Sequence, residues 1–251
     1  ASYGHKYVFL YMGGFFIAVA IEKWNLHRRI ALNIINLIGT NIKFIILGFM
    51  VATAFLSMWI SNTATSVMML PIGTAIILQL KDNPQTSEDE NKTFGKALML
   101  AIAYSASIGG IGTLIGTPPN LVFAGIVEEL YGIEISFVKW ALLGMPISIL
   151  LLIFCWKYIT NIAFKFKQKE CPCGKTEIKR LLDELGKISL QEKRVLFVFV
   201  LTALCWITRS FFLEKFLPNI DDTIIAMLAG IALFLIPSGK NKEKQKRLLS
   251  W

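Results

Sequence analysis

Long apolar runs alternate with short polar segments along the whole chain, and the charged residues are confined to those short segments. A soluble protein would intersperse charges among its apolar positions. A helix needs about 20 mainly apolar residues to cross roughly 30 Å of hydrocarbon, and such runs recur here. The pattern predicts an all-α polytopic membrane protein. Ordinary spans are expected at residues 7–21, which is a short run, and at residues 137–164, 195–212 and 223–237.

One pair of apolar runs is separated only by the tripeptide SNT, residues 61–63, and no charge lies between Lys43 and Lys81. A loop between two full spans reaches the headgroups and usually carries charge or glycine and proline turn residues. An uncharged tip therefore predicts a re-entrant helical hairpin, residues 42–80, that turns around inside the membrane. Two complete spans joined by a short turn are the alternative.

A second apolar run, residues 97–127, follows a hydrophilic loop, residues 81–96, and is broken by SIGGIGTLIGTPPN, residues 107–120. Glycines and paired prolines do not sustain an ideal helix. Such a break survives at membrane depth only where protein or a watery cavity satisfies the freed backbone groups. The segment predicts a broken helix, the alternative being a helix that ends at the membrane surface.

The polar connectors predict the orientation of the chain. Short loops rich in Lys and Arg remain in the cytoplasm, so the three basic segments are expected inside and the two acidic loops outside. The basic segments are residues 23–29, 165–194 and 240–247, and the acidic loops are residues 128–134 and 213–222. Within the second basic segment, residues 176–187 have the pattern of a short amphipathic helix.

Composition excludes several classes of protein. Although the net charge is +9, the basic residues lie beside apolar spans, so no nucleic-acid partner is expected. The four cysteines are too few for a disulfide scaffold, and CPCG lacks the second ligand pair of a zinc site. They are Cys155, Cys171, Cys173 and Cys205. Neither interruption contains an acid, a lysine or a histidine, so the chain is not expected to be an enzyme.

The two interruptions are instead suited to binding ions. A turn between half-helices leaves carbonyl groups at the end of one and amide groups at the start of the next without intrahelical partners. Carbonyl groups offer partial negative charge to a cation, and amide groups suit an anion. Ser and Asn side chains that merely pack two helices together are the alternative explanation.

Two motifs, LSMWISNTATSVMMLPI (residues 56–72) and SIGGIGTLIGTPPN (residues 107–120), resemble the first-half motifs of the divalent anion:sodium symporter (DASS) family. The similarity extends into WNLHRRIAL (residues 24–32) and LGFMVATAFLSMW (residues 47–59), and effectively covers the chain. The family includes bacterial dicarboxylate carriers and animal citrate and sulfate carriers. The resemblance implies an inverted-repeat transporter with a re-entrant hairpin and an unwound helix in each half, working as a homodimer with an elevator-like motion.

The resemblance also implies binding residues. Sodium-binding positions are the Ser57 carbonyl, Ser61, Asn62 and Gly116, and the only metal expected is sodium. Substrate-binding positions are Asn62, Thr63, Thr117 and Pro118. Supporting positions are Gly110, Gly112 and Asn120.

The family's second SNT hairpin has no counterpart here and both ends of the chain look cut, so a truncated transporter is expected. The expected division is a scaffold span with an interfacial helix (residues 1–41), part of a transport domain (42–127), a span with a cytoplasmic connector (128–188) and two spans that start a second repeat (189–251). The expected function is sodium-coupled symport of small dicarboxylates or other divalent anions, in a lipid bilayer, across the cell membrane. A sodium-independent dicarboxylate antiporter and an anion channel are the alternatives.

Overall fold

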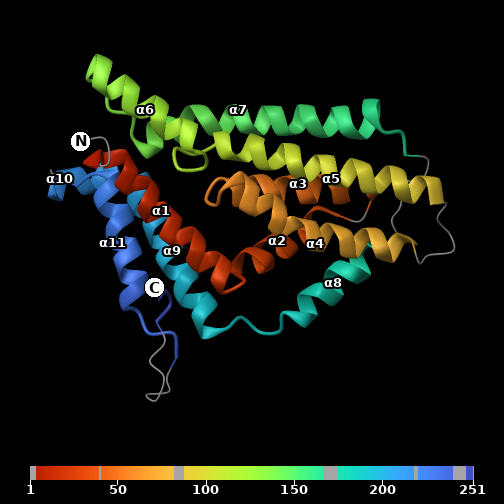
Figure 1. Cartoon of the computed structure of the whole chain (residues 1–251). Helices are drawn as coiled ribbons and strands as arrows, with labels where there is room; N and C mark the ends of the chain where they lie inside the picture. The colour runs from red at the N-terminus through yellow and green to blue at the C-terminus, as the bar shows by residue number, and fades with distance from the viewer. Residues whose placement is uncertain are drawn as a thin grey trace. The chain divides into compact units, whose positions relative to one another are not determined.

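The computed structural model describes residues 4–39, 41–81, 88–166, 174–217, 220–239 and 247–250, which are helical apart from turns, short connections and isolated β-bridge residues such as Pro237 and Arg247 (Figure 1). This confirms the all-α prediction. The helices are α1 (Lys6–Lys23), α2 (Leu26–Ile38), α3 (Ile42–Ser57), α4 (Asn62–Lys81), α5 (Glu88–Ile111), α6 (Pro118–Tyr131), α7 (Phe137–Lys157), α8 (Gly174–Glu184), α9 (Leu190–Thr208), α10 (Glu214–Phe216) and α11 (Asp222–Leu235), with π-helical segments η2 (Tyr158–Ala163) and η3 (Arg209–Leu213).

Among the described residues, three helices are long and apolar enough to cross a membrane: Asn62–Leu80, Glu88–Ile111 and Phe137–Ala163. Helices α1 and α2 together would make a fourth, broken span, whereas α3 and α11 are apolar but only 16 and 14 residues long. The long α7 leaves large apolar side chains exposed, such as Leu142 and Phe154, each 71% accessible. Such a surface is typical of a helix that faces lipid or another apolar partner.

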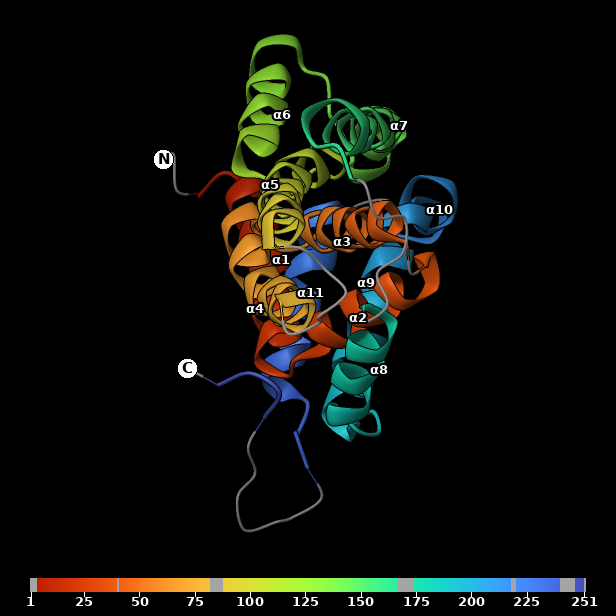
Figure 2. The same cartoon turned by 90° about the vertical axis from the view of Figure 1, so that its right-hand side faces the viewer.

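The chain divides into two compact units. Unit 1 contains residues 1–26, 113–144 and 187–251. Helices α1, α9 and α11 lie side by side in it, and α6 contacts α1 (Figures 1 and 2). The backbones of α1 and α11 approach closely, because a Cβ atom on Gly13 would lie 2.5 Å from the Ala226 carbonyl carbon. Only glycine allows this packing.

The connectors of unit 1 gather at two opposite ends of its bundle. At the start of α1, Lys6 pairs with Glu128. Glu128 was predicted to begin an acidic loop, but it lies in the last turn of α6, because the helix continues to Tyr131 and ends at Gly132. At the end of α1, the Trp24 indole N–H donates to the Leu248 carbonyl at 3.0 Å, next to the third basic segment. The predicted orientation requires this grouping of acidic loops at one end and basic segments at the other.

Helix α9 begins five residues before the apolar run that predicted it. Ser189 and Glu192 form a capping box, in which each side chain accepts a hydrogen bond from the other residue's backbone N–H. These bonds satisfy donors that a helix start leaves unpaired, so polar residues enter the first turn. Apolar periodicity alone does not detect this extension.

Unit 2 contains residues 27–112 and 145–186, and its core is formed by α3, α4 and α5. Helix α4 presents a buried stripe with the three- and four-residue spacing of one helix face. The stripe consists of Thr65, Met69, Ile72, Ile76 and Leu80. Helix α2 contacts α3 through Gly48, where a Cβ atom would lie 3.2 Å from the Ile35 Cα atom.

The predicted hydrophilic loop at residues 81–96 needs a correction, because α5 starts at Glu88 within it. Three acidic residues occupy the first turn, where the helix dipole favours negative charge, and Lys92 pairs with Glu88 at 2.8 Å. The buried Asn91 amide donates to the Leu80 carbonyl near the end of α4. Polar residues therefore extend the helix instead of forming a loop, and residues 82–87 lie outside the described part.

Helix α8 confirms the amphipathic helix predicted within the second basic segment. Ile178 and Leu181 are buried in unit 2, where α8 contacts α4. The Arg180 guanidinium donates to both carboxylate oxygens of Glu177, at 2.5 and 2.8 Å. Arg29 donates to the Leu185 and Gly186 carbonyl groups just beyond the helix end. Cys155 and Cys205 are free thiols, and Cys171 and Cys173 lie outside the described residues.

We predict that α8 loses stability in acid. The Arg180 guanidinium holds the pKa of Glu177 below its usual range, against the opposing effect of burial. This pKa is lower in the folded helix than in the unfolded chain. The stabilisation that ionised Glu177 gives to α8 is therefore complete above the unfolded value of about 4.3 and is lost as the pH falls toward the folded value. Hydrogen exchange of α8 amides, corrected for intrinsic pH dependence, should accelerate below about pH 4.3. Glu177→Gln should lack this acceleration, and matching profiles for the two proteins would contradict the prediction.

Candidate functional site

The first predicted interruption is a tight turn between α3 and α4. Helix α3 ends at Ser57 and α4 begins at Asn62. The Ile60 N–H donates to the Leu56 carbonyl at 2.9 Å, and Ser61 receives the Thr65 N–H on its carbonyl and the Ala64 N–H on its hydroxyl. A helix start leaves its first N–H groups without intrahelical acceptors, so the Asn62 and Thr63 amides face the turn without an acceptor in their own helix.

Three oxygen atoms meet at the end of α3. The Ser57 hydroxyl oxygen lies 2.7 Å from the Asn62 side-chain oxygen and 2.7 Å from the Ala106 carbonyl oxygen of α5. A hydroxyl has one proton and donates it to one acceptor at a time, so three oxygens share a single proton. Ser57 is fully buried and Asn62 half-buried. The arrangement is rich in acceptors, as an oxygen-ligated cation site must be.

Glycines at the end of α5 and just beyond it allow these three oxygen atoms to lie close together. A Cβ atom on Gly109 would overlap the Ala54 backbone of α3, and one on Gly110 would overlap the Asn62 carboxamide. A Cβ atom on Gly112 would lie 2.9 Å from the Met58 side chain. The glycines of the second motif therefore let α5 approach the turn that carries the first motif.

The remaining predicted residues of the turn are more open to solvent. Ser61 and Thr63 are both exposed, and in the described structure Ser61 uses its hydroxyl to accept the Ala64 N–H at 3.3 Å. The family resemblance implies the Ser57 carbonyl, whereas in the structure the Ser57 hydroxyl contacts Asn62. The Ala106 carbonyl was not predicted, because no motif residue marks it and a backbone oxygen carries no residue-type signal.

The second predicted interruption lies between the end of α5 and the start of α6. The Thr113 carbonyl receives the Gly116 N–H at 3.3 Å and the Asn120 side-chain amide at 2.8 Å. Thr117 precedes α6 in an extended conformation, and its side chain makes no capping hydrogen bond. Pro118 occupies the first helical position, where its missing N–H costs nothing.

Two prolines limit what the start of α6 offers to an anion. Pro118 and Pro119 have no N–H groups, so the helix lacks two of the four donors that an α-helix usually presents. The next N–H, that of Asn120, donates to the Thr117 carbonyl at 3.1 Å. The half-buried Thr117 hydroxyl is thus the main polar group available at this helix start.

The predicted site residues fall into two sets. Unit 2 brings Ser57 and Asn62 together against Gly110, with Ser61, Thr63 and Gly112 in the same unit. Unit 1 contains Gly116, Thr117, Pro118 and Asn120, of which Asn120 is tied to the Thr113 carbonyl.

Residues 1–251 match the family model described as the sodium:sulfate symporter transmembrane region. The chain belongs to this family. It is 49% identical over 255 residues to the sodium-dependent dicarboxylate transporter SdcS of Staphylococcus saprophyticus, and 48% identical to SdcS of Staphylococcus aureus strain USA300. Both alignments cover 100% of this chain and 49% of the relative, so the chain spans about half the length of these relatives.

Membership in the sodium:sulfate symporter family confirms the resemblance found in the two motifs. The family and the relatives are transporters and not enzymes. Together with the apolar helices, this makes the chain part of a multi-pass membrane protein.

We predict that Gly110→Ala destabilises the turn. Its methyl group would overlap the Asn62 carboxamide and displace it from Ser57, and overpacking of this kind costs about 1–3 kcal/mol. Gly95→Ala is the matched control in the same helix, since its Cβ atom would lie 3.5 Å from Ile77, an ordinary contact. Alanine also favours a helix by up to about 1 kcal/mol over glycine. In detergent, Gly110→Ala should lower the thermal unfolding midpoint of the full-length protein and Gly95→Ala should not; equal midpoints would argue against this packing.

Proposed function

We propose that this chain contributes the first half of the binding site of a sodium-coupled symporter for small dicarboxylates such as succinate or malate. The observation that carries the proposal is the group of three oxygen atoms at the uncharged α3–α4 turn, which shares one hydroxyl proton. The relatives point the same way, because SdcS is named a sodium-dependent dicarboxylate transporter. Sodium is accordingly a transported ion and not a resident cofactor.

The proposed sodium ligands are Ser57, Ser61 and Asn62 at the turn and Gly116 at the helix break. A hard cation prefers oxygen ligands, and the Ser57 and Asn62 oxygens already lie 2.7 Å apart. The Ala106 carbonyl, equally close to Ser57, extends the donor set with a backbone oxygen. When the ion binds, the Ser57 proton can turn toward one acceptor while the other oxygens face the cation.

The proposed substrate contacts are Asn62, Thr63, Thr117 and Pro118. The start of α4 supplies N–H groups and the Thr63 hydroxyl for a carboxylate. At the start of α6 the prolines supply no N–H, so the Thr117 hydroxyl makes the polar contact and Pro118 shapes the surface beside it. An anion held in this way relies on neutral donors alone.

Asn62 belongs to both proposed sets and therefore couples the two ligands. A cation on its side-chain oxygen fixes the carboxamide and the start of α4, and it adds positive charge beside the anion. Sodium then raises the affinity for the dicarboxylate, and by linkage the dicarboxylate raises the affinity for sodium by the same factor. Each net positive charge that moves inward gains about 2.3 kcal/mol per 100 mV, which can concentrate an anion against its gradient.

A sodium-independent antiporter is the nearest alternative function, and an anion channel is the next. An antiporter would take up labelled dicarboxylate only when a dicarboxylate is present inside the vesicle. A channel would conduct without saturating at low concentrations. The oxygen-rich turn favours sodium coupling, because neither alternative requires a cation site.

We further propose that the full-length protein works as a homodimer with an elevator-like motion in the membrane, as the family resemblance implies. The exposed apolar surface of α7 requires cover from lipid or protein, which fits an assembly of this kind.

The coupling is tested by uptake of labelled succinate into vesicles that contain the full-length protein. An inward sodium gradient should increase the initial uptake rate well above that in a potassium gradient of equal size, because sodium completes the anion site. Empty vesicles provide the background. Equal uptake in the two gradients would remove sodium coupling. Uptake that then required dicarboxylate inside the vesicle would favour the antiporter.

Ser57→Ala tests the oxygen cluster directly. Losing one oxygen ligand should raise the sodium concentration for half-maximal uptake by about threefold to tenfold, a change equivalent to one hydrogen bond. Ser105→Ala is the matched control, since Ser105 is also fully buried but donates to the Ala101 carbonyl of its own helix. The same sodium dependence in Ser57→Ala and Ser105→Ala would show that Ser57 does not contribute to the sodium site.

A further inference from the structure

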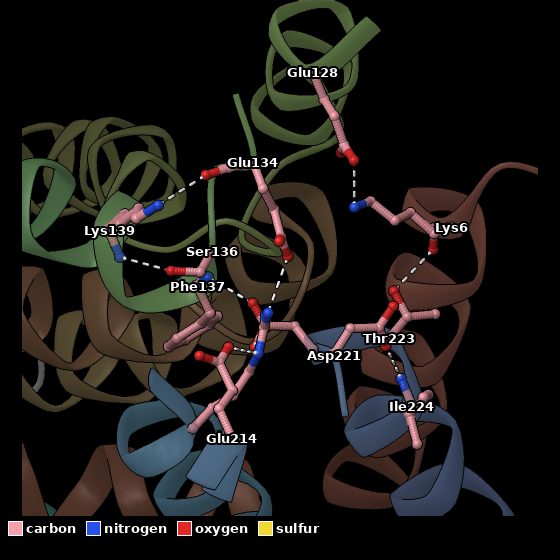
Figure 3. A network of polar contacts seen from close by, with 12 residues as sticks. Lys6, Glu128, Glu134, Ser136, Phe137, Lys139, Glu214, Asp221, Thr223 and Ile224 are labelled. Atoms are coloured by element: carbon pink, nitrogen blue, oxygen red, sulfur yellow. Dashed lines mark hydrogen bonds and ion pairs between the residues drawn. The ribbon is translucent and has the colours of Figure 1, made fainter. Parts of the chain in front are cut away.

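Helix α6 carries proposed substrate contacts at its start and is held by charged residues at its other end. Near that end, Lys6 of α1 pairs with Glu128 at 2.5 Å, and each side chain is about one-third exposed (Figure 3). Gly132 then ends the helix in the left-handed conformation, with its N–H bonded to the Glu128 carbonyl. The helix is therefore tied to α1 just before it stops.

A second anchor follows the helix end. The Arg209 guanidinium lies 3.1 Å from Glu134, 3.0 Å from Glu214 and 3.2 Å from Asp222. These three carboxylates come from the α6–α7 connection, α10 and α11. The Arg209 side chain is only 7% exposed. A planar guanidinium with five N–H donors can serve several carboxylates at once, as lysine cannot.

Neutral contacts fix the same connection. The Phe137 N–H donates to the Asp222 carboxylate at 2.7 Å, and the Phe137 ring stacks on Trp206 with centroids 4.8 Å apart. The Trp206 indole N–H donates to the Asp222 carbonyl at 3.0 Å. The Thr223 hydroxyl donates to the Lys6 carbonyl, which joins the two anchors through α11. The connection is thus held by α1, α9 and α11 together.

We propose that Arg209 and Lys6 are positioning residues for the substrate site, acting through α6. The inference rests on the proposed function, because it is the substrate contact of Thr117 and Pro118 that gives the position of α6 a role. Neither Arg209 nor Lys6 touches the substrate. Each sets the direction of the helix from the end remote from Thr117.

Helix geometry gives the size of the effect. A helix of 14 residues is about 21 Å long, so a change of about 5° at one end moves the other by roughly 2 Å. Misplacement of a binding group by about 1 Å can reduce activity substantially, by up to two orders of magnitude in enzymes. At the start of the helix, the Asn120 bond to the Thr113 carbonyl ties the turn to the same rod. Thr117 therefore follows any change in the anchored end.

The test uses the full-length protein in vesicles and compares Glu134→Gln, Lys6→Gln, Arg209→Gln and Arg209→Lys. Glu88→Gln is the matched control, because it removes a carboxylate from an exposed pair with Lys92 at the start of α5. Glu134→Gln and Lys6→Gln should raise the KM for succinate by about threefold or more, while the maximal rate changes less. The same variants should accelerate hydrogen exchange in residues 113–121. Glu88→Gln should change neither the KM nor the hydrogen exchange. Arg209→Lys should change both quantities less than Arg209→Gln does.

A purely structural anchor would lower the thermal unfolding midpoint and leave the KM unchanged, and that result would overturn the proposal. If the Arg209 variants fail to fold, the milder Lys6→Gln variant decides the question by the same two measurements. If the wild-type protein transports no dicarboxylate, the proposed function fails. Hydrogen exchange in residues 113–121 still tests separately whether the anchors position the start of α6. Hydrogen exchange identical to that of the wild type in both Glu134→Gln and Lys6→Gln would overturn this positioning role.

Discussion

Backbone hydrogen bonding is the constraint on which the two proposed site segments depend, because we propose that both lie at membrane depth. A buried N–H or C=O group without a partner costs several kcal/mol in hydrocarbon, so a helix can stop at membrane depth only where the protein replaces the lost bonds. At the α3–α4 turn, Ser61 accepts two N–H groups through its carbonyl and hydroxyl oxygens. At the break before α6, the Thr113 carbonyl takes two donors. Both segments use short polar residues because those side chains reach the backbone beside them.

The turn also has more hydrogen-bond acceptors than donors at the position proposed for the cation. Near Ser57, three oxygens share one proton, and the α5 glycines bring them together by removing the side chains that would hold the helices apart. Close packing thus creates the acceptor cluster, and the cluster does not require any charged residue. A residue that widens the contact between α5 and the turn would weaken the fold and the proposed ion site together.

The sequence predicted those features that break a local pattern. The SNT tip and the Gly- and Pro-rich break were detectable because polar or helix-breaking residues interrupt long apolar runs, and the α8 helix because its apolar residues follow a helical period. The start of α5 was not predicted, since charged residues at positions 88–96 resemble a loop until Asn91 and Lys92 find partners. The Arg209 cluster was also beyond local patterns, because Glu134 lies 75 residues away in the chain. In the sequence, Arg209 is merely an isolated charge near a span end.

The lack of cationic side chains at the turn and the break bears on the proposed coupling between sodium and the anion. The turn and the break contain no Lys, Arg or His between residues 44 and 80 or between residues 107 and 120. Burying a dicarboxylate against neutral donors alone is unfavourable, because hydrogen bonds replace only part of the hydration of an ion. At the proposed sodium site, a cation on the oxygens of the turn would supply the missing positive charge without a fixed cationic side chain. A fixed lysine or arginine would hold the anion whether or not sodium was present and would not need the ion gradient. Under the proposed function, neutral polar residues therefore make the anion's affinity depend on sodium, which is the property that a symporter requires.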